Sequence, residues 1–370
     1  MSSSQLFKPL QVGPVALQHR VVLAPLTRYK ATTEHVPFLP LVAEYYGQRA
    51  SRPGTLLITE ATFIAARAGG YAHIPGIWSP AQIKGWKAVA DTVHGKGSFI
   101  FMQLWALGRA ADAAQLLSES PEHAYVSASD VPLAGHDEVP RALTIAEINE
   151  YVALYAQAAK NAIVAGMDGV EIHNANGYLP DQFLQDVSNT RTDEYGGSIE
   201  NRARFTLAVV DAVVAAIGAE RTAIRLSPWS PFQGVELPEG MRMADPLPTF
   251  AYVVSALAAR HPGLAYVHLV EPRINGNASC EGGAHDSNDP LRALWPGPLV
   301  RAGGFARAEA LKTAEGGDMV AFGRLFISNP DLPTRLEKDV PLTAYNRETF
   351  YLVGENTPRG YTDQPFAVAA

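Results

Sequence analysis

The stretch from Gly169 to Phe205 reads GVEIHNANGYLPDQFLQDVSNTRTDEYGGSIENRARF and contains most of one βα unit. Its first four residues are apolar and mostly β-branched, apart from Glu171, which is typical of a strand that is covered on both faces. A helical pattern of apolar residues begins at Ile199, after an intervening loop. Strands that are covered on both faces belong to parallel sheets, so this stretch indicates an α/β fold.

Similar strand-like runs recur along the chain and alternate with helical stretches, which favours a parallel sheet with right-handed crossovers. Eight such runs fit a closed barrel better than an open sheet, and no GxGxxG sequence follows the first run to favour a Rossmann fold. We therefore expect residues 1–370 to form a single (β/α)8 TIM barrel domain. The predicted strands are 21–25, 55–60, 99–104, 169–173, 222–226, 266–270, 299–302 and 319–322, and the clearest helices are 145–165, 199–217 and 248–259.

Two segments fall outside this alternation. The segment through Gln18 has short apolar runs around Gly13 and Pro14, and it is predicted to form a hairpin that plugs the bottom of the barrel. Residues 116–143 are rich in Ser, Pro, His and Asp, and they interrupt the third βα unit. Because loops that follow barrel strands lie at the catalytic face, this insertion is expected to cap the active site.

The composition excludes several classes of function. The 370 residues carry 30 basic and 37 acidic side chains, a net charge of −7, and no basic block of the kind that binds nucleic acid. The single cysteine, Cys280, excludes an intrachain disulfide, a four-cysteine zinc site and a cysteine-ligated iron–sulfur cluster, and no metal site is expected. The start, MSSSQLFKPLQVG, lacks the apolar core of a signal peptide, and no apolar run reaches the roughly 20 residues of a membrane span. We expect a cytoplasmic protein without membrane or nucleic-acid partners.

A histidine, an asparagine and a tyrosine follow the strand that opens the quoted stretch. His173 stands where that strand ends, and Asn176 follows three residues later. Gly177 then allows a tight turn before Tyr178, so the three polar side chains can converge. Two of them can hydrogen-bond a carbonyl oxygen and the third can deliver a proton, which makes them a candidate catalytic group. The alternative is a core histidine with satisfied hydrogen bonds, and an asparagine that caps a helix beginning near Pro180.

Functional residues of a (β/α)8 barrel gather at the carboxyl ends of its strands, and polar or glycine residues follow most of the predicted strands. After the seventh and eighth strands, glycines would let backbone N–H groups approach a ligand, and an arginine could grip phosphate oxygens. The helices that follow are expected to point their positive ends at the same place, which predicts a phosphate site. The alternative is two glycine turns beside a surface arginine. The residues placed at strand ends are Thr27, Ala61, Gln103, His173, Asn176, Arg225, Gly303, Gly304, Gly323 and Arg324.

The quoted stretch resembles the most recognisable block of the old yellow enzyme family, FMN-dependent NADPH dehydrogenases and ene-reductases that are built on a single (β/α)8 barrel. The resemblance extends over essentially the whole chain with the motifs in the same order, and it is to the fungal or yeast branch. The other blocks that carry it are VVLAPLTRYK, YYGQRASRPGTLLITEAT, QLWALGRAA, IRLSPW, VHLVEPR, RAGGF, VAFGRLFISNPDLP and FYLVG.

The resemblance implies a tightly but non-covalently bound FMN, with NADPH or NADH as the hydride donor. Thr27 resembles the hydroxyl that donates near the hydride-carrying nitrogen of the flavin. Gln103 and Arg225 resemble the amide and the cation that hold its pyrimidine edge, and the glycine loops with Arg324 resemble its phosphate site. Ala61 stands where many relatives have glycine, which puts its backbone contact in doubt. The apolar and aromatic walls would come from Pro25, Leu26, Trp105, Phe350 and Tyr351.

The resemblance also implies a mechanism. His173 and Asn176 would hydrogen-bond the carbonyl or nitro group of a small α,β-unsaturated substrate, and Tyr178 would protonate its α-carbon. Trp105 and Tyr351 would contact the same substrate, and the enzyme is expected to be a monomer or a homodimer.

Two other functions remain open. In a flavin-dependent isomerase of the same family, as in fungal alkaloid pathways, the protonating tyrosine is replaced, so Tyr178 favours the reductase. A flavin-free lyase or isomerase on a phosphate-binding barrel would use the same glycine loops. The loop at 273–288, after the sixth strand, is individual to this chain and is expected to help set substrate choice.

Overall fold

The computed structural model describes residues 4–233, 242–276, 278–283 and 285–367, and within them eight parallel strands close into a barrel. Each strand pairs with the next along the chain, and the last pairs with the first to complete the ring. All eight predicted strands are confirmed. They are β3 (Val21–Leu23), β4 (Leu56–Ile58), β6 (Phe99–Trp105), β9 (Gly169–Asn174), β10 (Thr222–Leu226), β11 (Tyr266–Val270), β14 (Leu299–Ala302) and β15 (Met319–Phe322).

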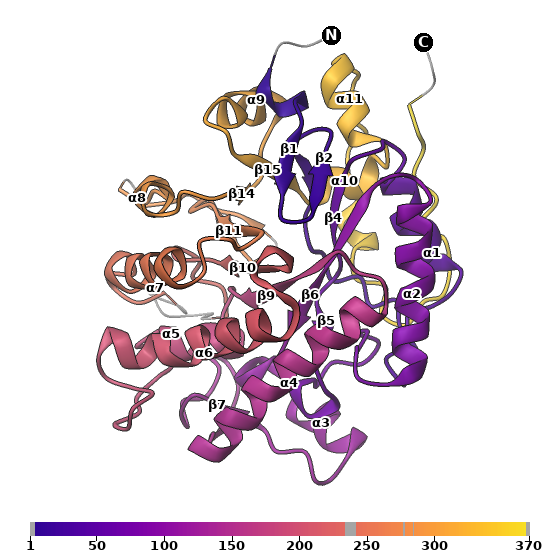
Figure 1. Ribbon diagram of the computed structural model, residues 1–370. Coiled ribbons are helices and arrows are strands. Elements are labelled where there is room, and N and C mark those ends of the chain that lie inside the picture. The colour runs from indigo at the N-terminus through magenta and orange to yellow at the C-terminus, as the bar shows by residue number, and fades with distance from the viewer. Residues whose placement is uncertain (1–3, 234–241, 277, 284, 368–370) are drawn as a thin grey trace.

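Helices surround the barrel (Figure 1), and the longest three begin at N-caps that the sequence encodes. Ser79, Thr144 and Ser198 each accept a hydrogen bond from a backbone N–H of the first turn, which satisfies a donor that the helix itself leaves unpaired. The helices predicted from periodicity are confirmed to within two residues. The helices are α1 (Leu41–Arg49), α2 (Pro80–His94), α3 (Ala113–Glu119), α4 (Ile145–Val164), α5 (Leu179–Leu184), α6 (Ile199–Ile217), α7 (Leu247–Arg260), α8 (Asp289–Leu294), α9 (Arg307–Glu315), α10 (Arg324–Ser328) and α11 (Leu332–Lys338).

The interior of the barrel changes from apolar to polar along its axis. Its amino-terminal part is a cluster of buried apolar side chains that includes Val22, Phe101 and Tyr266. A polar layer follows toward the carboxyl ends of the strands, and strand register fixes its members. Gln103 pairs with Glu171 between β6 and β9, and Arg225 of β10 pairs with His173 on one side and His268 on the other.

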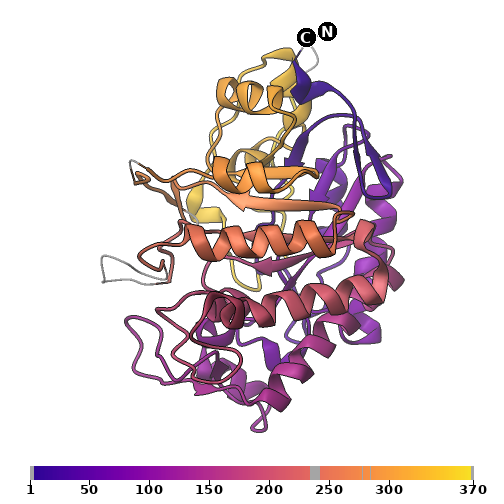
Figure 2. The same cartoon turned by 60° about the vertical axis from the view of Figure 1, so that its left-hand side comes forward.

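The N-terminal hairpin closes the bottom of the barrel, as predicted. Strands β1 (Leu10–Val12) and β2 (Val15–Leu17) pair in antiparallel fashion. Their side chains Val12, Val15 and Leu17 belong to the same apolar cluster as the amino-terminal part of the barrel interior. Figure 2 shows the hairpin on the right, at the opposite end from the long loops that follow the barrel strands. The polar layer is therefore accessible only from the other end.

The long loops contain short secondary structure of their own. Segment 116–143 continues from α3 and holds β7 (Val126–Ser127) and β8 (Arg141–Ala142), which pair in parallel, while β5 (Thr62–Phe63) extends the sheet beside β6. The loop after β11 holds a small hairpin of β12 (Ile274–Asn275) and β13 (Ala278–Ser279). No helix in the described part of the chain is long and apolar enough to cross a membrane.

The hairpin turn provides a test of the plug. Gly13 has φ +50°, and a Cβ there would overlap the backbone carbonyl of Glu220, in the turn that precedes β10. We expect Gly13→Ala to lower the free energy of unfolding by about 3 kcal/mol, because it adds a clash to an unfavourable left-handed conformation. Thermal and urea unfolding would measure the loss.

Gly135 supplies a matched control for that substitution. Its φ is +81°, but no heavy atom lies within 4 Å of the Cβ position, so Gly135→Ala changes the backbone preference alone. It should cost about 1 kcal/mol. Equal losses for the two variants would contradict close packing of the hairpin against the barrel.

Candidate active site

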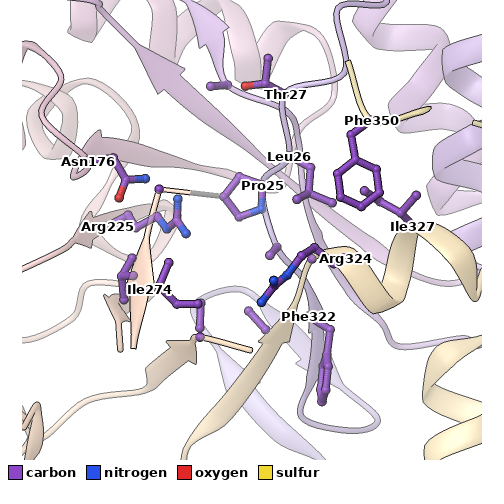
Figure 3. Close-up of a pocket in the computed structure, with 18 of the residues that line it drawn as sticks. Pro25, Leu26, Thr27, Asn176, Arg225, Ile274, Phe322, Arg324, Ile327 and Phe350 are labelled. Carbon is purple, nitrogen blue, oxygen red and sulfur yellow. The ribbon is translucent and has the colours of Figure 1, made fainter. Parts of the chain in front are cut away.

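A cavity of about 600 Å³ lies at the carboxyl ends of the barrel strands, opposite the hairpin. Every residue that sequence and resemblance assign to the cofactor or substrate site lines this one cavity, and Figure 3 shows several of them around it. None of residues 116–143 lines it, although Tyr125 packs in the cluster that contains Trp105 and Tyr178. The predicted residues in the lining are Pro25, Leu26, Thr27, Ala61, Gln103, Trp105, His173, Asn176, Tyr178, Arg225, Gly303, Gly304, Gly323, Arg324, Phe350 and Tyr351.

The turn after β9 has two consecutive residues in the left-handed conformation, Asn176 at φ 57° and Gly177 at φ 74°. Glycine adopts this conformation freely and asparagine with modest strain. Both backbone N–H groups are held: that of Asn176 donates to Ser227 Oγ at 2.7 Å, and that of Gly177 to the Asp181 carboxylate at 2.9 Å. The turn is thus fixed before any ligand arrives.

The amide of Gln182 anchors this turn to the loop after β6. Its Nε2 donates to the carbonyl oxygens of Gly177 and Leu107, at 2.8 and 2.9 Å. Its Oε1 accepts from the backbone N–H of Arg109 and from the Ser127 hydroxyl of β7. Segment 116–143 therefore braces the turn through Ser127.

The alternative interpretation of His173 and Asn176 is wrong. Helix α5 begins after Tyr178 without a side-chain cap, so Asn176 caps no helix. His173 Nδ1 and Asn176 Oδ1 are buried and have no hydrogen-bond partner among the described residues. Since buried polar atoms in folded proteins are nearly always paired, these two atoms are exceptions that leave their hydrogen-bonding capacity available to a ligand.

The rings of Trp105, His173 and Tyr178 pack against one another. The ring centroids of Tyr178 lie 4.7 Å from Trp105 and 4.9 Å from His173, both edge to face. Burial, and then the charge of Arg225, lowers the pKa of His173 well below its ordinary value, so the imidazole is neutral at neutral pH. Burial, together with Tyr71 and Tyr29, raises the pKa of Tyr178 well above its ordinary value. The site thus holds a neutral imidazole beside a phenol that keeps its proton.

The glycine loops and Arg324 form the other end of the cavity. A Cβ on Gly304, which has φ +64°, would lie 3.2 Å from Arg324 Nη2, and a Cβ on Gly323 would lie 2.9 Å from a methyl group of Leu26. These glycines keep backbone accessible to a ligand. Arg324 Nη2 donates to Ser279 Oγ at 2.9 Å, which places the guanidinium at the mouth of the cavity under β13.

The two helices that follow the glycine loops differ in whether their first backbone N–H groups are already hydrogen-bonded. Helix α10 begins at Arg324, at the edge of the cavity. At the start of α9, however, the Glu309 carboxylate accepts from the backbone N–H of Ala306 at 3.0 Å. One backbone donor at the amino-terminal end of α9 is therefore already paired within the helix start.

These features fit FMN by their chemistry. Arg324 and the glycine loops can hold a phosphate at one end, and Thr27, Gln103 and Arg225 offer polar groups at the other. Arg225 Nε is buried and has no partner among the described residues. In Figure 3, Arg225 and Arg324 enter the cavity from different sides, with Pro25 and Leu26 between them.

Several residues of the cavity were not predicted. Tyr29 follows Thr27 in the loop after β3, and its ring packs edge to face on Tyr351 at 6.0 Å. Its position near a strand end could have identified it. No comparable signal exists for residues deep in long loops, because loops lack the periodicity that predicts direction. Those residues are Tyr71, Phe232, Ile274, Gly276, Ser279 and Tyr345.

The chain was compared with known families and proteins. Residues 5–343 match the family described as NADH:flavin oxidoreductase / NADH oxidase. A chanoclavine-I aldehyde reductase of Penicillium roqueforti is 52% identical, over 98% of this chain and 97% of the relative. Enoate reductase 1 of Kluyveromyces lactis is 43% identical, over 99% and 94%. A probable inactive reductase of Epichloe festucae is 46% identical, over 99% and 96%.

The fold is also similar to the folds of solved structures. The crystal structure of Old Yellow Enzyme from a Pichia species superimposes with a TM-score of 0.89 and 38% identity, covering 100% of this chain and 95% of that one.

The phosphate assignment can be tested by replacing Arg324. Arg324→Ala should weaken FMN binding by about tenfold or more, because a bidentate charge-assisted contact in a partly buried site would be lost. Fluorimetric titration of apoprotein measures the dissociation constant. Arg307→Ala, on α9 and outside the cavity lining, is the matched control and should leave the constant unchanged. Equal constants for both variants would remove Arg324 from the phosphate site.

Proposed function

The chain belongs to the NADH:flavin oxidoreductase / NADH oxidase family and is an oxidoreductase, and we propose that it acts as an FMN-dependent ene-reductase on α,β-unsaturated carbonyl or nitro compounds. One observation carries the proposal. The buried Nδ1 of His173, which has no partner among the described residues, and a phenol with a raised pKa meet in one cavity, beside a turn whose backbone N–H groups are already hydrogen-bonded. An imidazole that can donate a hydrogen bond can stabilise an oxyanion, and a protonated phenol can act as a general acid.

FMN held in this cavity would, once reduced by NADPH or NADH, provide the hydride for the β-carbon of the substrate. That addition moves negative charge onto the carbonyl or nitro oxygen. His173 and Asn176 can each donate a hydrogen bond to this oxygen, and a neutral imidazole can do so without leaving a buried charge after product release. Donors that are fixed in advance typically stabilise such an oxyanion by a few kcal/mol each.

Tyr178 is proposed to protonate the α-carbon. Its ring packs against His173 at 4.9 Å, so a substrate that is bonded to the imidazole lies beside the phenol. Burial keeps the phenol in its acid form, and the proton is available when the carbanion forms. Trp105 and Tyr351 line the same cavity and are proposed to orient the substrate through its apolar part.

The nicotinamide and the substrate are proposed to use this cavity in turn. The described residues form one barrel, and its polar layer lines one cavity at the carboxyl end, so both reactants would have to enter the same cavity. Ping-pong kinetics is the consequence. NADPH is the donor that we propose first, with NADH as the alternative.

The competing functions make different demands on these residues. A relative at 46% identity is named a probable inactive reductase, so overall similarity does not decide activity. The presence of Tyr178 beside His173 supports reduction over isomerisation, since only net reduction requires a new proton on carbon. A flavin-free barrel enzyme would leave the aromatic walls and the buried Arg225 without a use.

Tyr178→Phe separates the steps of the proposed reaction. Reduction of the flavin by NADPH should be nearly unchanged, because that step does not need the phenol proton. Reoxidation by 2-cyclohexenone should slow by about a hundredfold to ten-thousandfold, the usual contribution of general acid catalysis. Anaerobic stopped-flow absorbance at the flavin bands measures each half-reaction.

Molecular oxygen provides the control oxidant in the same experiment, since its reaction requires no protonation of carbon. The variant should react with oxygen at close to the wild-type rate. If the enone reoxidises variant and wild type equally fast, Tyr178 is not the acid. If purified protein neither binds FMN nor is coloured by it, the ene-reductase proposal is wrong as a whole.

A further inference from the structure

A buried carboxylate, Glu171, lies directly behind the floor of the cavity. Gln103 Nε2 donates to its Oε1 at 2.7 Å, and its Oε2 lies 2.8 Å from His268 Nδ1. The side chains of Glu171 and His268 are 0% exposed, and neither lines the cavity. Gln103 and Arg225 do line it. Glu171 therefore touches one floor residue and reaches no ligand itself.

The charges of this group can be assigned from its surroundings. Burial alone would raise the pKa of Glu171, but His268, Arg225 and Gln103 together hold it below its ordinary value, so it is a carboxylate. Burial lowers the pKa of His268, although the neighbouring Glu171 carboxylate opposes that shift. Arg225 is a cation, and among the acidic groups Glu171 favours that charged form most strongly. Arg225 lies opposite His268, the residue that contacts Glu171, so one negative and one positive charge lie near each other inside the barrel.

We propose that Glu171 sets the charge that the cavity floor presents to a bound flavin, by offsetting Arg225, and that it fixes the orientation of the Gln103 amide. Glu171 is then a positioning residue for the cofactor, because it acts through Arg225 and Gln103. The inference rests on the proposed function, since it requires that these two side chains face FMN.

Hydrogen bonds to both carboxylate oxygens hold Glu171 in one orientation behind the cavity floor. Both Glu171 oxygens are held by fixed donors, so the carboxylate cannot turn away from Arg225. The side-chain amide of Gln103 donates an N–H to Glu171. Its amide oxygen therefore points away from the carboxylate and can accept a hydrogen bond from a ligand. Charges inside a protein interact more strongly than in water, so a nearby carboxylate disfavours added negative charge on the flavin. Reduction adds such charge.

Glu171→Gln should therefore make reduced FMN bind more tightly relative to oxidised FMN, by about tenfold or more. For a two-electron couple, tenfold corresponds to a rise of about 30 mV in the midpoint potential. The measurement is a spectroelectrochemical titration of the holoprotein against a reference dye, with the dissociation constant of oxidised FMN measured on apoprotein. If Glu171 had a purely structural role, Glu171→Gln would lower the free energy of unfolding but would not change the ratio of the affinities for reduced and oxidised FMN.

Three further variants sharpen the test. Asp91→Asn removes an equal charge from the exposed Lys87–Asp91 pair on α2 and should leave the midpoint potential unchanged. Glu171→Asp keeps the charge but shortens the reach to Gln103, so it should weaken FMN binding without raising the potential. Glu171→Met removes the charge with an apolar side chain of similar length, and it replaces Glu171→Gln if that variant does not fold.

The outcomes are separable. A midpoint potential that is unchanged or lower in the charge-removing variants overturns the inference, and so does a potential that rises as much in Glu171→Asp. Wild-type apoprotein that does not bind FMN contradicts the proposed function instead. A rise confined to the charge-removing variants supports the role of Glu171.

Discussion

The register of the parallel strands is the constraint on which the site depends. Arg225 lies opposite both His173 and His268 because β10 is paired with β9 and β11 without offset at this level. Side chains alternate between the two faces of a strand, so a slip of one residue would turn Arg225 out of the barrel and bring Ile224 in. The outer faces of these strands are covered by helices, where an arginine could not be accommodated. Packing of the outer strand faces against the helices thus fixes which side chains, including Arg225, point into the barrel.

The apolar packing at the amino-terminal end of the barrel offsets unfavourable features at its polar, carboxyl end. Buried polar atoms without partners are unfavourable by about 1–3 kcal/mol each, and the left-handed Asn176 adds strain. The hairpin plug and the apolar cluster hold the strands in place independently of the cavity, so the donors can stay aimed at a ligand. Donors that are already oriented need no rearrangement when charge develops on a substrate, and that preorganisation is the physical source of the expected catalysis.

The sequence predicted the barrel well because each buried strand is a short apolar run between loops, and the longest helices carry both periodicity and capping residues. The barrel rule then predicts from the sequence that His173, Arg225 and Arg324 lie at strand ends. Other features depend on contacts between distant segments. Glu171 stood out as a charge in an apolar strand, but nothing in the sequence names His268, 97 positions away, as its partner. The hydrogen bond from the Ala306 N–H to Glu309 at the start of α9 does have a local signal, because Glu309 stands three residues after the N-cap.

The cavity therefore has two parts that arise in different ways. Its floor is made of strand residues whose positions follow from register, and the proposed chemistry is carried by His173 at the end of β9 and by Asn176 and Tyr178 on the turn that follows. Its rim is made by loops: Phe232 comes from the loop after β10, and Ile274 from β12. Gly276 is packed so closely on Phe232 that a Cβ there would overlap the ring, so these two loops fix each other. A change in either loop would reshape the rim and leave the floor intact. The barrel residues, by contrast, are bound to one another through the polar layer, in which Glu171 contacts both Gln103 and His268.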